Sequence, residues 1–221
     1  MTRTWKKLLC CAVLFVGVSA AAIGAETLLS VSFAQGAWDP SAWVLAKNPT
    51  VPHLGKWAQR DICVGNETTA DPAKKSSLND TLTTMVYGKP FAGDCTVAAT
   101  FEIGAGAAPG IVVAQDWAPD GEGRPQYGEF YEVIIYEKGI NLWHHFARDG
   151  KRLYELSAYS TFPLKPDTRY TLRVQRKKQT LDISVDGHQI GLLIPSLPNE
   201  LYLGCEGCEG VCRLYDFAVT R

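Results

Sequence analysis

The stretch that most constrains the fold of this chain is YTLRVQRKKQTLDISVDGHQI, from Tyr170 to Ile190. Apolar residues take every second position from Tyr170 to Val174 and again from Leu181 to Val185, so they line one face of two strands. Asp186-Gly187 then supplies the positive φ angles of a tight hairpin turn. A third strand follows at 190–194. The stretch therefore predicts an antiparallel β-meander with one face in a core.

The first 25 residues have the composition of a secretory signal peptide. Three basic residues lie within the first seven positions, an uncharged apolar run extends from Leu8 to Ala22, and small residues surround the expected cleavage point after Ala25. The run is shorter than the roughly 20 residues that a membrane-spanning helix needs. We therefore expect export to a periplasmic or secreted location, with no membrane span after cleavage.

Removal of 25 of the 221 residues leaves a chain of 196, enough for one domain with a substantial core, which we place at 26–221. The signal contains three of the 22 basic residues and none of the 23 acidic ones, so the remainder has a net charge of −4. This charge does not favour nucleic acid or an anionic membrane as a partner. The net charge gives no information on the oligomeric state.

Five cysteines remain after cleavage, and an oxidising compartment favours disulfides between them. The cluster C-E-G-C-E-G-V-C predicts a local bridge between Cys205 and Cys212 across a hairpin, with a zinc site as the less favoured alternative because no fourth ligand lies nearby. Cys63 and Cys95 form the second expected bridge, which leaves Cys208 as the odd thiol.

Strand patterns follow one another along the whole mature chain. The main segments are Glu26–Phe33, Asp94–Ile103, Gly110–Ala114, Glu129–Glu137, Ile140–Arg148, Arg152–Ser160, Leu201–Cys205 and Val211–Thr220. Gly110–Ala114 is apolar throughout, as expected for a strand that is covered on both faces. Some thirteen strands and no convincing helix predict an all-β fold, a two-layer antiparallel β-sandwich.

The order of these strands, with GIVV, YEVII, NLWHH, LDISVDG and the final LYLG…YDFAVTR, resembles the concanavalin A-like lectin/glucanase superfamily. Within it the chain is similar to laminin-G-type domains and to the bacterial 3-keto-disaccharide hydrolase-like domains. The resemblance covers nearly all of the mature chain, and LDISVDG is its most telling segment. It implies a jelly-roll sandwich and a carbohydrate-related role.

Two functions follow from the resemblance and the residues. Tyr131-Glu132-Val133 matches the Tyr-Glu-Val of the hydrolase-like domains, but their arginine corresponds to Ala114. Glu132 is the only polar position of that set retained, so it is the candidate acid/base if the protein is a glycoside hydrolase. Glu129 is an odd number of positions away and points to the opposite face. The missing pattern favours the other function, a non-catalytic, lectin-like carbohydrate-binding protein.

Sugar binding needs an aromatic platform and a few convergent polar groups. Trp117 and Tyr127, in the long loop at 115–128, meet this description together with Asp116 and Arg124, although Trp117 could equally anchor the loop. On the strand at 140–148, Trp143 and His145 share one face and are further candidates, while His144 points to the other. Trp143 is also a candidate core residue.

No cofactor is predicted from the motifs. Asp116, Asp120 and Glu122 are weak candidates for calcium ligands, because their carboxylates are the hard oxygen donors that calcium prefers, although their spacing is not that of an EF-hand loop.

Overall fold

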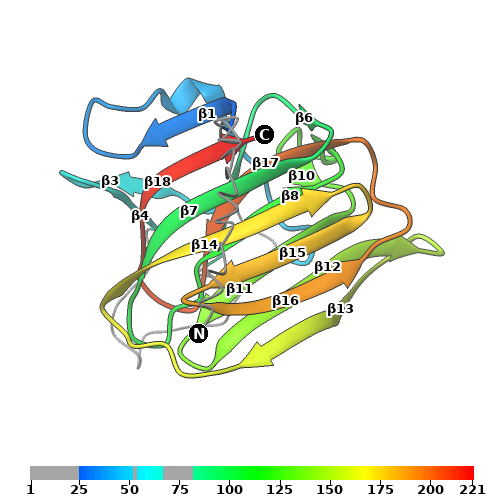
Figure 1. Cartoon of the computed structure of the whole chain (residues 1–221). Coiled ribbons are helices and arrows are strands. Elements are labelled where there is room, and N and C mark those ends of the chain that lie inside the picture. Colours follow the sequence, from blue (N-terminus) through cyan, green and yellow to red (C-terminus); the bar gives the residue numbers. More distant parts are fainter. Residues whose placement is uncertain (1–24, 52–53, 67–81) are drawn as a thin grey trace, which may run out of the picture.

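The protein consists of two antiparallel β-sheets packed face to face (Figure 1). This computed structural model describes residues 25–51, 54–66 and 82–221. The predicted signal peptide, apart from Ala25, lies outside the described residues. In the described part no helix is long and apolar enough to cross a membrane, and the only helical element is a 3₁₀ turn, Pro40–Ala42.

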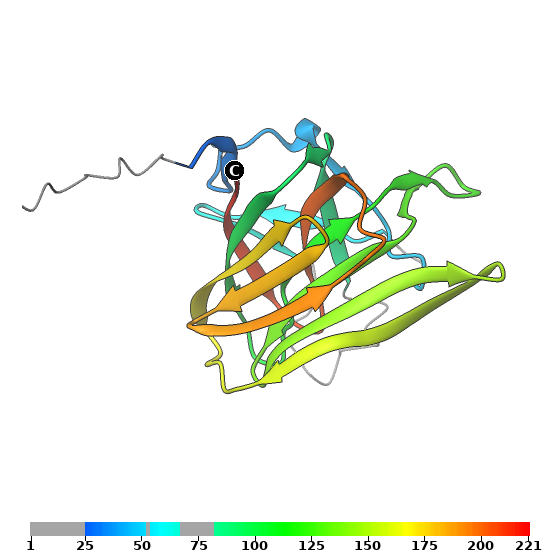
Figure 2. The same ribbon diagram turned by 45° about the vertical axis from the view of Figure 1, so that its right-hand side comes forward.

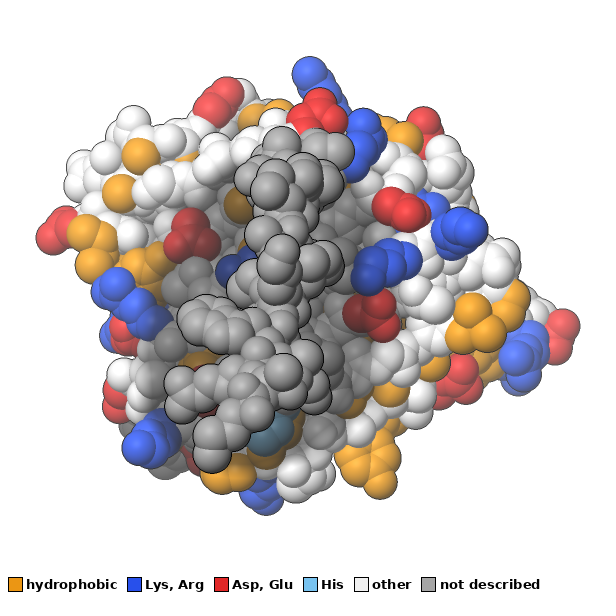
Figure 3. All heavy atoms as spheres, in the orientation of Figure 1, with side chains coloured by type: hydrophobic (Ala, Val, Ile, Leu, Met, Phe, Trp, Pro, Cys, Tyr) orange, Lys and Arg blue, Asp and Glu red, His pale blue; other side chains and the backbone are white. Residues whose placement is uncertain are grey.

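The first sheet, called sheet A, follows the order β16-β15-β14-β7-β18-β4-β3, with β1 also paired to β18. Its strands are β1 (Thr27–Ser32), β3 (Trp57–Gln59), β4 (Val64–Asn66), β7 (Cys95–Ile103), β14 (Thr168–Lys177), β15 (Thr180–Val185), β16 (His188–Leu193) and β18 (Cys212–Thr220). Acidic and basic side chains are interspersed on the face of the molecule shown in Figure 3.

The second sheet, called sheet B, follows the order β13-β12-β11-β8-β17-β5-β2, with β6 also paired to β17. Its strands are β2 (Trp43–Leu45), β5 (Thr83–Tyr87), β6 (Phe91–Ala92), β8 (Gly110–Ala114), β11 (Phe130–Tyr136), β12 (Gly139–Arg148), β13 (Lys151–Thr161) and β17 (Glu200–Gly207). A small separate ribbon joins β9 (Trp117–Pro119) to β10 (Pro125–Tyr127).

The predicted meander is confirmed as β14, β15 and β16, paired in sequence order. Its Asp-Gly turn has φ angles of 48° at Asp186 and 79° at Gly187, as a tight hairpin requires. A second Asp-Gly turn at Asp149 and Gly150 joins β12 to β13 with φ angles of 52° and 72°. The β12–β13 hairpin is the longest among the described residues, and its tip projects beyond the body of the sandwich (Figure 2).

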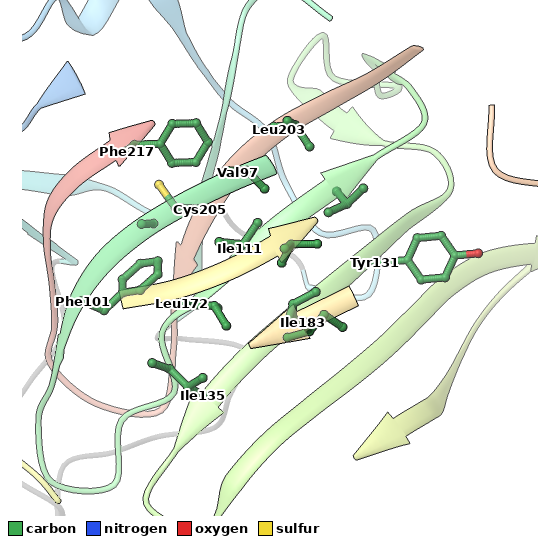
Figure 4. Close-up of a cluster of buried hydrophobic side chains, with 14 of the residues drawn as sticks. Val97, Phe101, Ile111, Tyr131, Ile135, Leu172, Ile183, Leu203, Cys205 and Phe217 are labelled. Carbon is green, nitrogen blue, oxygen red and sulfur yellow. The ribbon is translucent and has the colours of Figure 1, made fainter. Parts of the chain in front are cut away.

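The core lies between the sheets and is built from alternate residues of their strands. Figure 4 shows Phe101, Leu172 and Phe217 of sheet A facing Ile111 and Leu203 of sheet B. The predicted coverage of both faces of β8 is confirmed, since all five of its residues are buried. The all-β sandwich prediction is thus correct, although the described residues form 18 strands instead of some thirteen, because several loops contain short paired segments.

The prediction of a disulfide between Cys63 and Cys95 is wrong. Cys63 precedes Val64, which pairs with Leu214 of β18, and Leu214 pairs in turn with Phe101 of β7. Cys95 lies six residues from Phe101 along β7, about 20 Å at 3.3 Å per residue. A disulfide joins Cα atoms only about 4.4–6.8 Å apart, so opposite ends of β7 separate these two thiols.

The bridge expected between Cys205 and Cys212 is not formed either. All five cysteines of the described residues are buried free thiols. Cys208 Sγ donates a hydrogen bond to the carbonyl oxygen of Ala108 at 3.1 Å. Burial raises the pKa of Cys212 to about 12 and that of Cys205 and Cys208 well above the usual thiol value. These thiols are therefore packed as small apolar side chains.

Candidate functional site

A cleft of about 500 Å³ opens on the outer face of sheet B. Along β11, Tyr131 and Val133 point into the core, so the alternation of the strand turns Glu132 and Ile134 to this outer face. The described residues that line the cleft are Asn48, Thr50, Val51, Leu82, Glu132, Ile134, Trp143, His145, Tyr154, Cys208 and Glu209.

Glu132 is the centre of a buried hydrogen-bond network in this cleft. Asn48 Nδ2 lies 2.7 Å from Glu132 Oε1 and donates to it, and His145 Nε2 lies 2.9 Å from Glu132 Oε2. The Asn48 amide is oriented by its own oxygen, which accepts bonds from the backbone N–H and the hydroxyl of Thr50. Both carboxylate oxygens of Glu132 are thus held in place by the protein.

The His145 ring is fixed by its neighbours on the sheet. It pairs in register with Phe130 of β11 and stacks on that ring, with centroids 4.4 Å apart and planes 15° apart. Nδ1 of His145 is buried and has no hydrogen-bond partner among the described residues. The network therefore includes one imidazole nitrogen that is not used within the described structure.

A second carboxyl group, that of Glu206 on β17, lies across β8 from Glu132 on the same face of sheet B. Glu206 is fully buried and finds no N–H or hydroxyl donor among the described residues. Burial first, and then the charge of Glu132 and a hydrogen bond with it, raise the pKa of Glu206 well above the usual value. Two carboxyl groups can hydrogen-bond only if one keeps a proton, and the deeper Glu206 keeps it.

Gly110 makes room for this second carboxyl group. Gly110 lies between Glu206 and Ile134 in the register of β17, β8 and β11. A Cβ at this position would lie 3.0 Å from Glu206 Oε1 and 2.6 Å from the carbonyl oxygen of Val133. The glycine therefore allows the Glu206 side chain to lie across β8 toward Glu132.

Two aromatic side chains form the wall of the cleft. Trp143 on β12 is half-buried, and Tyr154 on β13 is 61% exposed. Their ring centroids lie 6.0 Å apart in an edge-to-face arrangement, with planes 65° apart. An aromatic wall beside a fixed polar network combines apolar contact with directional hydrogen bonding.

The structure brings Glu132, the candidate acid/base, together with Trp143 and His145, the pair that the sequence placed on one strand face as candidate ligand-binding residues. The opposite orientation of Glu129 is confirmed, since it lies 2.9 Å from Nε2 of His144, on the other face from Glu132 and His145. Asn48, Tyr154 and Glu206 were missed. Glu206 lies between Cys205 and Gly207 in a segment of small and apolar residues, a context that indicates a buried side chain.

The platform predicted in the long loop has to be corrected. Tyr127 is fully buried and packs on Phe130 with ring centroids 4.8 Å apart, so its face is closed to a sugar. Trp117 is half-buried and packs edge-on against Tyr202 at 6.1 Å. Trp117 therefore anchors the β9–β10 ribbon. This is the alternative to a sugar platform that the sequence left open.

The polar residues of this loop are used to hold it together. Asp120 Oδ2 lies 2.9 Å from Lys47 Nζ and 2.9 Å from Arg124 Nη2. The hydrogen bond from Lys47, followed by those from Arg124 and Glu122, holds the pKa of Asp120 well below its usual range. Asp120 is thus neutralised by two cations and is not placed as a calcium ligand.

The other two weak calcium candidates, Asp116 and Glu122, are not arranged as metal ligands either. Glu122 is exposed and pairs with Arg124 at 3.1 Å, and the Asp116 carboxylate lies against Gly128. In the part of the chain that the structure describes, no three His, Cys, Asp or Glu side chains are grouped so that they could hold a metal ion. Neither Asp116 nor Arg124 lines the cleft.

No family model matches the sequence, and no curated protein matches it either. Among solved structures, the chain is similar to the carbohydrate binding module CBM66 from Bacillus subtilis, with 12% identity, 81% of this chain and 96% of that chain covered and a TM-score of 0.56. A galectin-like protein of unknown function from Bacillus subtilis has 13% identity, 88% and 96% coverage and a TM-score of 0.60.

A third similar structure is a glycoside hydrolase family 16 endo-glucanase from Bacteroides ovatus, with 11% identity, 87% and 99% coverage and a TM-score of 0.55. These likenesses extend over most of both chains but at low identity, so what they establish is the fold. The fold of the protein is therefore a two-layer jelly-roll β-sandwich of the concanavalin A-like type.

Proposed function

We propose that this protein binds carbohydrate in the cleft on the outer face of sheet B. The observation that carries the proposal is the pairing of an aromatic wall, Trp143 and Tyr154, with the fixed network around Glu132. An aromatic ring packs on the apolar face of a sugar, and oriented polar groups select its hydroxyls. Solved proteins of the same fold include one described as a carbohydrate binding module, which supports this choice.

The arrangement of Glu132 favours binding over catalysis. Each of its carboxylate oxygens already has a partner, the amide of Asn48 or the imidazole of His145. A retaining glycosidase needs two carboxyl groups about 5 Å apart that both reach the substrate. Glu206 is fully buried and does not line the cleft, so it is not placed as the second group.

A glycan array of residues 26–221 tests this proposal, with bound sugars quantified by calorimetry. Trp143→Ala and Tyr154→Ala are each expected to weaken binding about tenfold, because each removes aromatic contact with the sugar. Leu193→Ala is the matched control, since Leu193 is a 64% exposed apolar residue on β16 of the other sheet. Equal affinity of all three variants and the wild type would refute the site.

Glycoside hydrolysis is the second candidate, and one observation favours it. Glu132 is not surrounded by apolar groups alone, because Glu209 also lines the cleft and is exposed. In this alternative Glu132 would act as acid/base and Glu209 would be the second carboxylate. Incubation of each array hit with the protein, followed by mass spectrometry, separates the two functions. Released sugar that is lost in Glu132→Gln would establish the hydrolase; intact ligand would support binding.

We also propose export, on the basis of the basic and apolar composition of residues 1–25. Expression of the full chain with N-terminal sequencing tests it. A mature protein that begins at Glu26 in the exported fraction is expected, and retention of Met1 in that fraction would contradict cleavage.

A further inference from the structure

The edge strand β13 exposes an unusual amount of apolar surface. Six large hydrophobic side chains are exposed in the described part of the chain, and four of them lie on this strand: Leu153, Tyr154, Leu156 and Tyr159. β13 pairs with β12 on one side and ends sheet B on the other. Hydrophobic side chains reach the surface along the lower right edge of Figure 3, where β12 and β13 lie in Figure 1. A concentration of this kind on one strand is typical of a binding surface.

A β-bulge determines which of these side chains share the face of the cleft. Leu142 pairs with Ala158 but the next residue, Trp143, pairs with Leu156, so Ser157 is an extra residue in β13. The bulge reverses the alternation of the strand, as such insertions do. Ala158 therefore packs toward the core, and Tyr159 pairs with Asn141, on the same face as Trp143.

Tyr154, Leu156 and Tyr159 consequently form one row on the cleft face, which we call the β13 track. The track begins at the cleft wall, where Tyr154 pairs with His145, and ends where Tyr159 pairs with Asn141. Asn141 and His145 are four positions apart on β12, a length of about 13 Å at 3.3 Å per residue. Tyr159 is 66% exposed and Tyr154 61%, so both rings are available to a ligand.

We propose that the ligand of the cleft is the interior of an extended polysaccharide chain, which continues out of the cleft along the β13 track. This inference rests on the proposed carbohydrate binding and adds the size of the ligand and its direction along β13. The track is longer than one sugar ring, and a second exposed tyrosine at its far end is placed to contact a sugar that the cleft itself does not reach.

Leu153 provides an internal comparison. It is also exposed, at 38%, and lies on the same strand, but it pairs with Phe146 on the opposite face from the track. A substitution at Leu153 changes the apolar surface of β13 without changing the track. Effects that depend on the track are therefore separable from effects on the strand.

An array of di- to octasaccharides from glucans, xylans, galactans and uronans tests the inference. For wild type we expect affinity to rise with chain length. Tyr159→Ala should lower affinity for the long oligosaccharides roughly three- to tenfold, the range for loss of one aromatic contact, and leave disaccharide binding unchanged. Tyr159→Phe should retain the wild-type length dependence, and so should the control Leu153→Ala. Thermal unfolding of each variant confirms that it is folded.

The outcomes separate the two proposals. Binding that does not rise with length, or a length dependence that Tyr159→Ala leaves intact, would overturn the extended ligand but leave the proposed function standing. Absence of binding to every arrayed glycan would overturn both. A change in the oligomeric state of Tyr159→Ala, with unchanged length dependence, would identify the track as a protein interface and also overturn the inference.

Discussion

Replacement of Glu206 by glutamine is expected to stabilise the protein at neutral pH and to flatten the pH dependence of its stability. Glu206 is fully buried, and burial together with the neighbouring Glu132 raises its pKa well above the ordinary 4.5. The folded protein therefore keeps this carboxyl neutral at a pH where the unfolded chain has ionised it. Glutamine has nearly the same shape, and its amide N–H can donate to Glu132 as the neutral acid does.

The sign and size of the effect follow from proton linkage. Above pH 4.5 the unfolded chain has lost the Glu206 proton while the folded state retains it. The free energy of unfolding then falls as pH rises, by about 1.4 kcal/mol per pH unit, until the pH reaches the raised pKa of the folded state. For a protein of this size the slope corresponds to roughly 3–6 °C in Tm per pH unit. Glutamine removes this contribution entirely.

Urea unfolding followed by tryptophan fluorescence, between about pH 5 and pH 7, measures the effect. The difference in unfolding free energy between Glu206→Gln and wild type should grow with pH in favour of the variant. Glu209→Gln is the matched control, because Glu209 follows Glu206 by three residues but is exposed where Glu206 is buried. Parallel pH profiles for wild type and Glu206→Gln would show that Glu206 is ionised in the folded protein and would refute the reasoning.

Three further predictions concern the scaffold. Arg176→Leu should lower the free energy of unfolding by about 3 kcal/mol or more, measured by urea unfolding, because its guanidinium donates to four backbone carbonyl oxygens, those of Gly93, Lys178, Pro198 and Asn199. Asp120→Asn should lower Tm at pH 7, because the carboxylate stabilises the fold only when it is ionised. The difference in Tm from wild type should vanish as pH falls through the lowered pKa of Asp120. A difference that persists in acid would contradict this. A thiol reagent should detect no cysteine in folded 26–221 and five after unfolding, whereas fewer than five would reveal disulfides.

Much of the fold could be predicted because its signals are local. The alternation in β14 and β15 and the Asp186-Gly187 turn depend on residues within a few positions of one another, and the structure confirms them. The apolar run Gly110–Ala114 likewise indicated a strand covered on both faces. The short strands β3, β4, β9 and β10 were missed as separate elements, because three-residue strands carry too little alternation to recognise.

The site was harder to predict because it depends on long-range register. Asn48 and Glu132 are separated by 84 residues and meet only after sheet B has formed. The alternation of β12 correctly placed Trp143 and His145 on one face. The Asp149-Gly150 turn sets the register that pairs Tyr154 with His145, so Tyr154 was within reach of local reasoning although it was not singled out. The loop at 115–128 showed the opposite error, since its aromatic and charged composition is that of a binding loop, yet Tyr127 and Asp120 are used for packing and ion pairing.

The free-energy cost of burying Glu206 bears on why the polar groups of the cleft are arranged as they are. A buried polar pair seldom stabilises a fold more than apolar side chains of the same volume would, and this one destabilises the protein increasingly as pH rises above 4.5. Its polar contact among the described residues is the Glu132 carboxyl, which is also held by Asn48 and His145. Three groups from three separate segments thus fix one carboxylate at the floor of a cleft. Because stability alone does not require this arrangement, it supports the proposed binding role of Glu132 in the cleft.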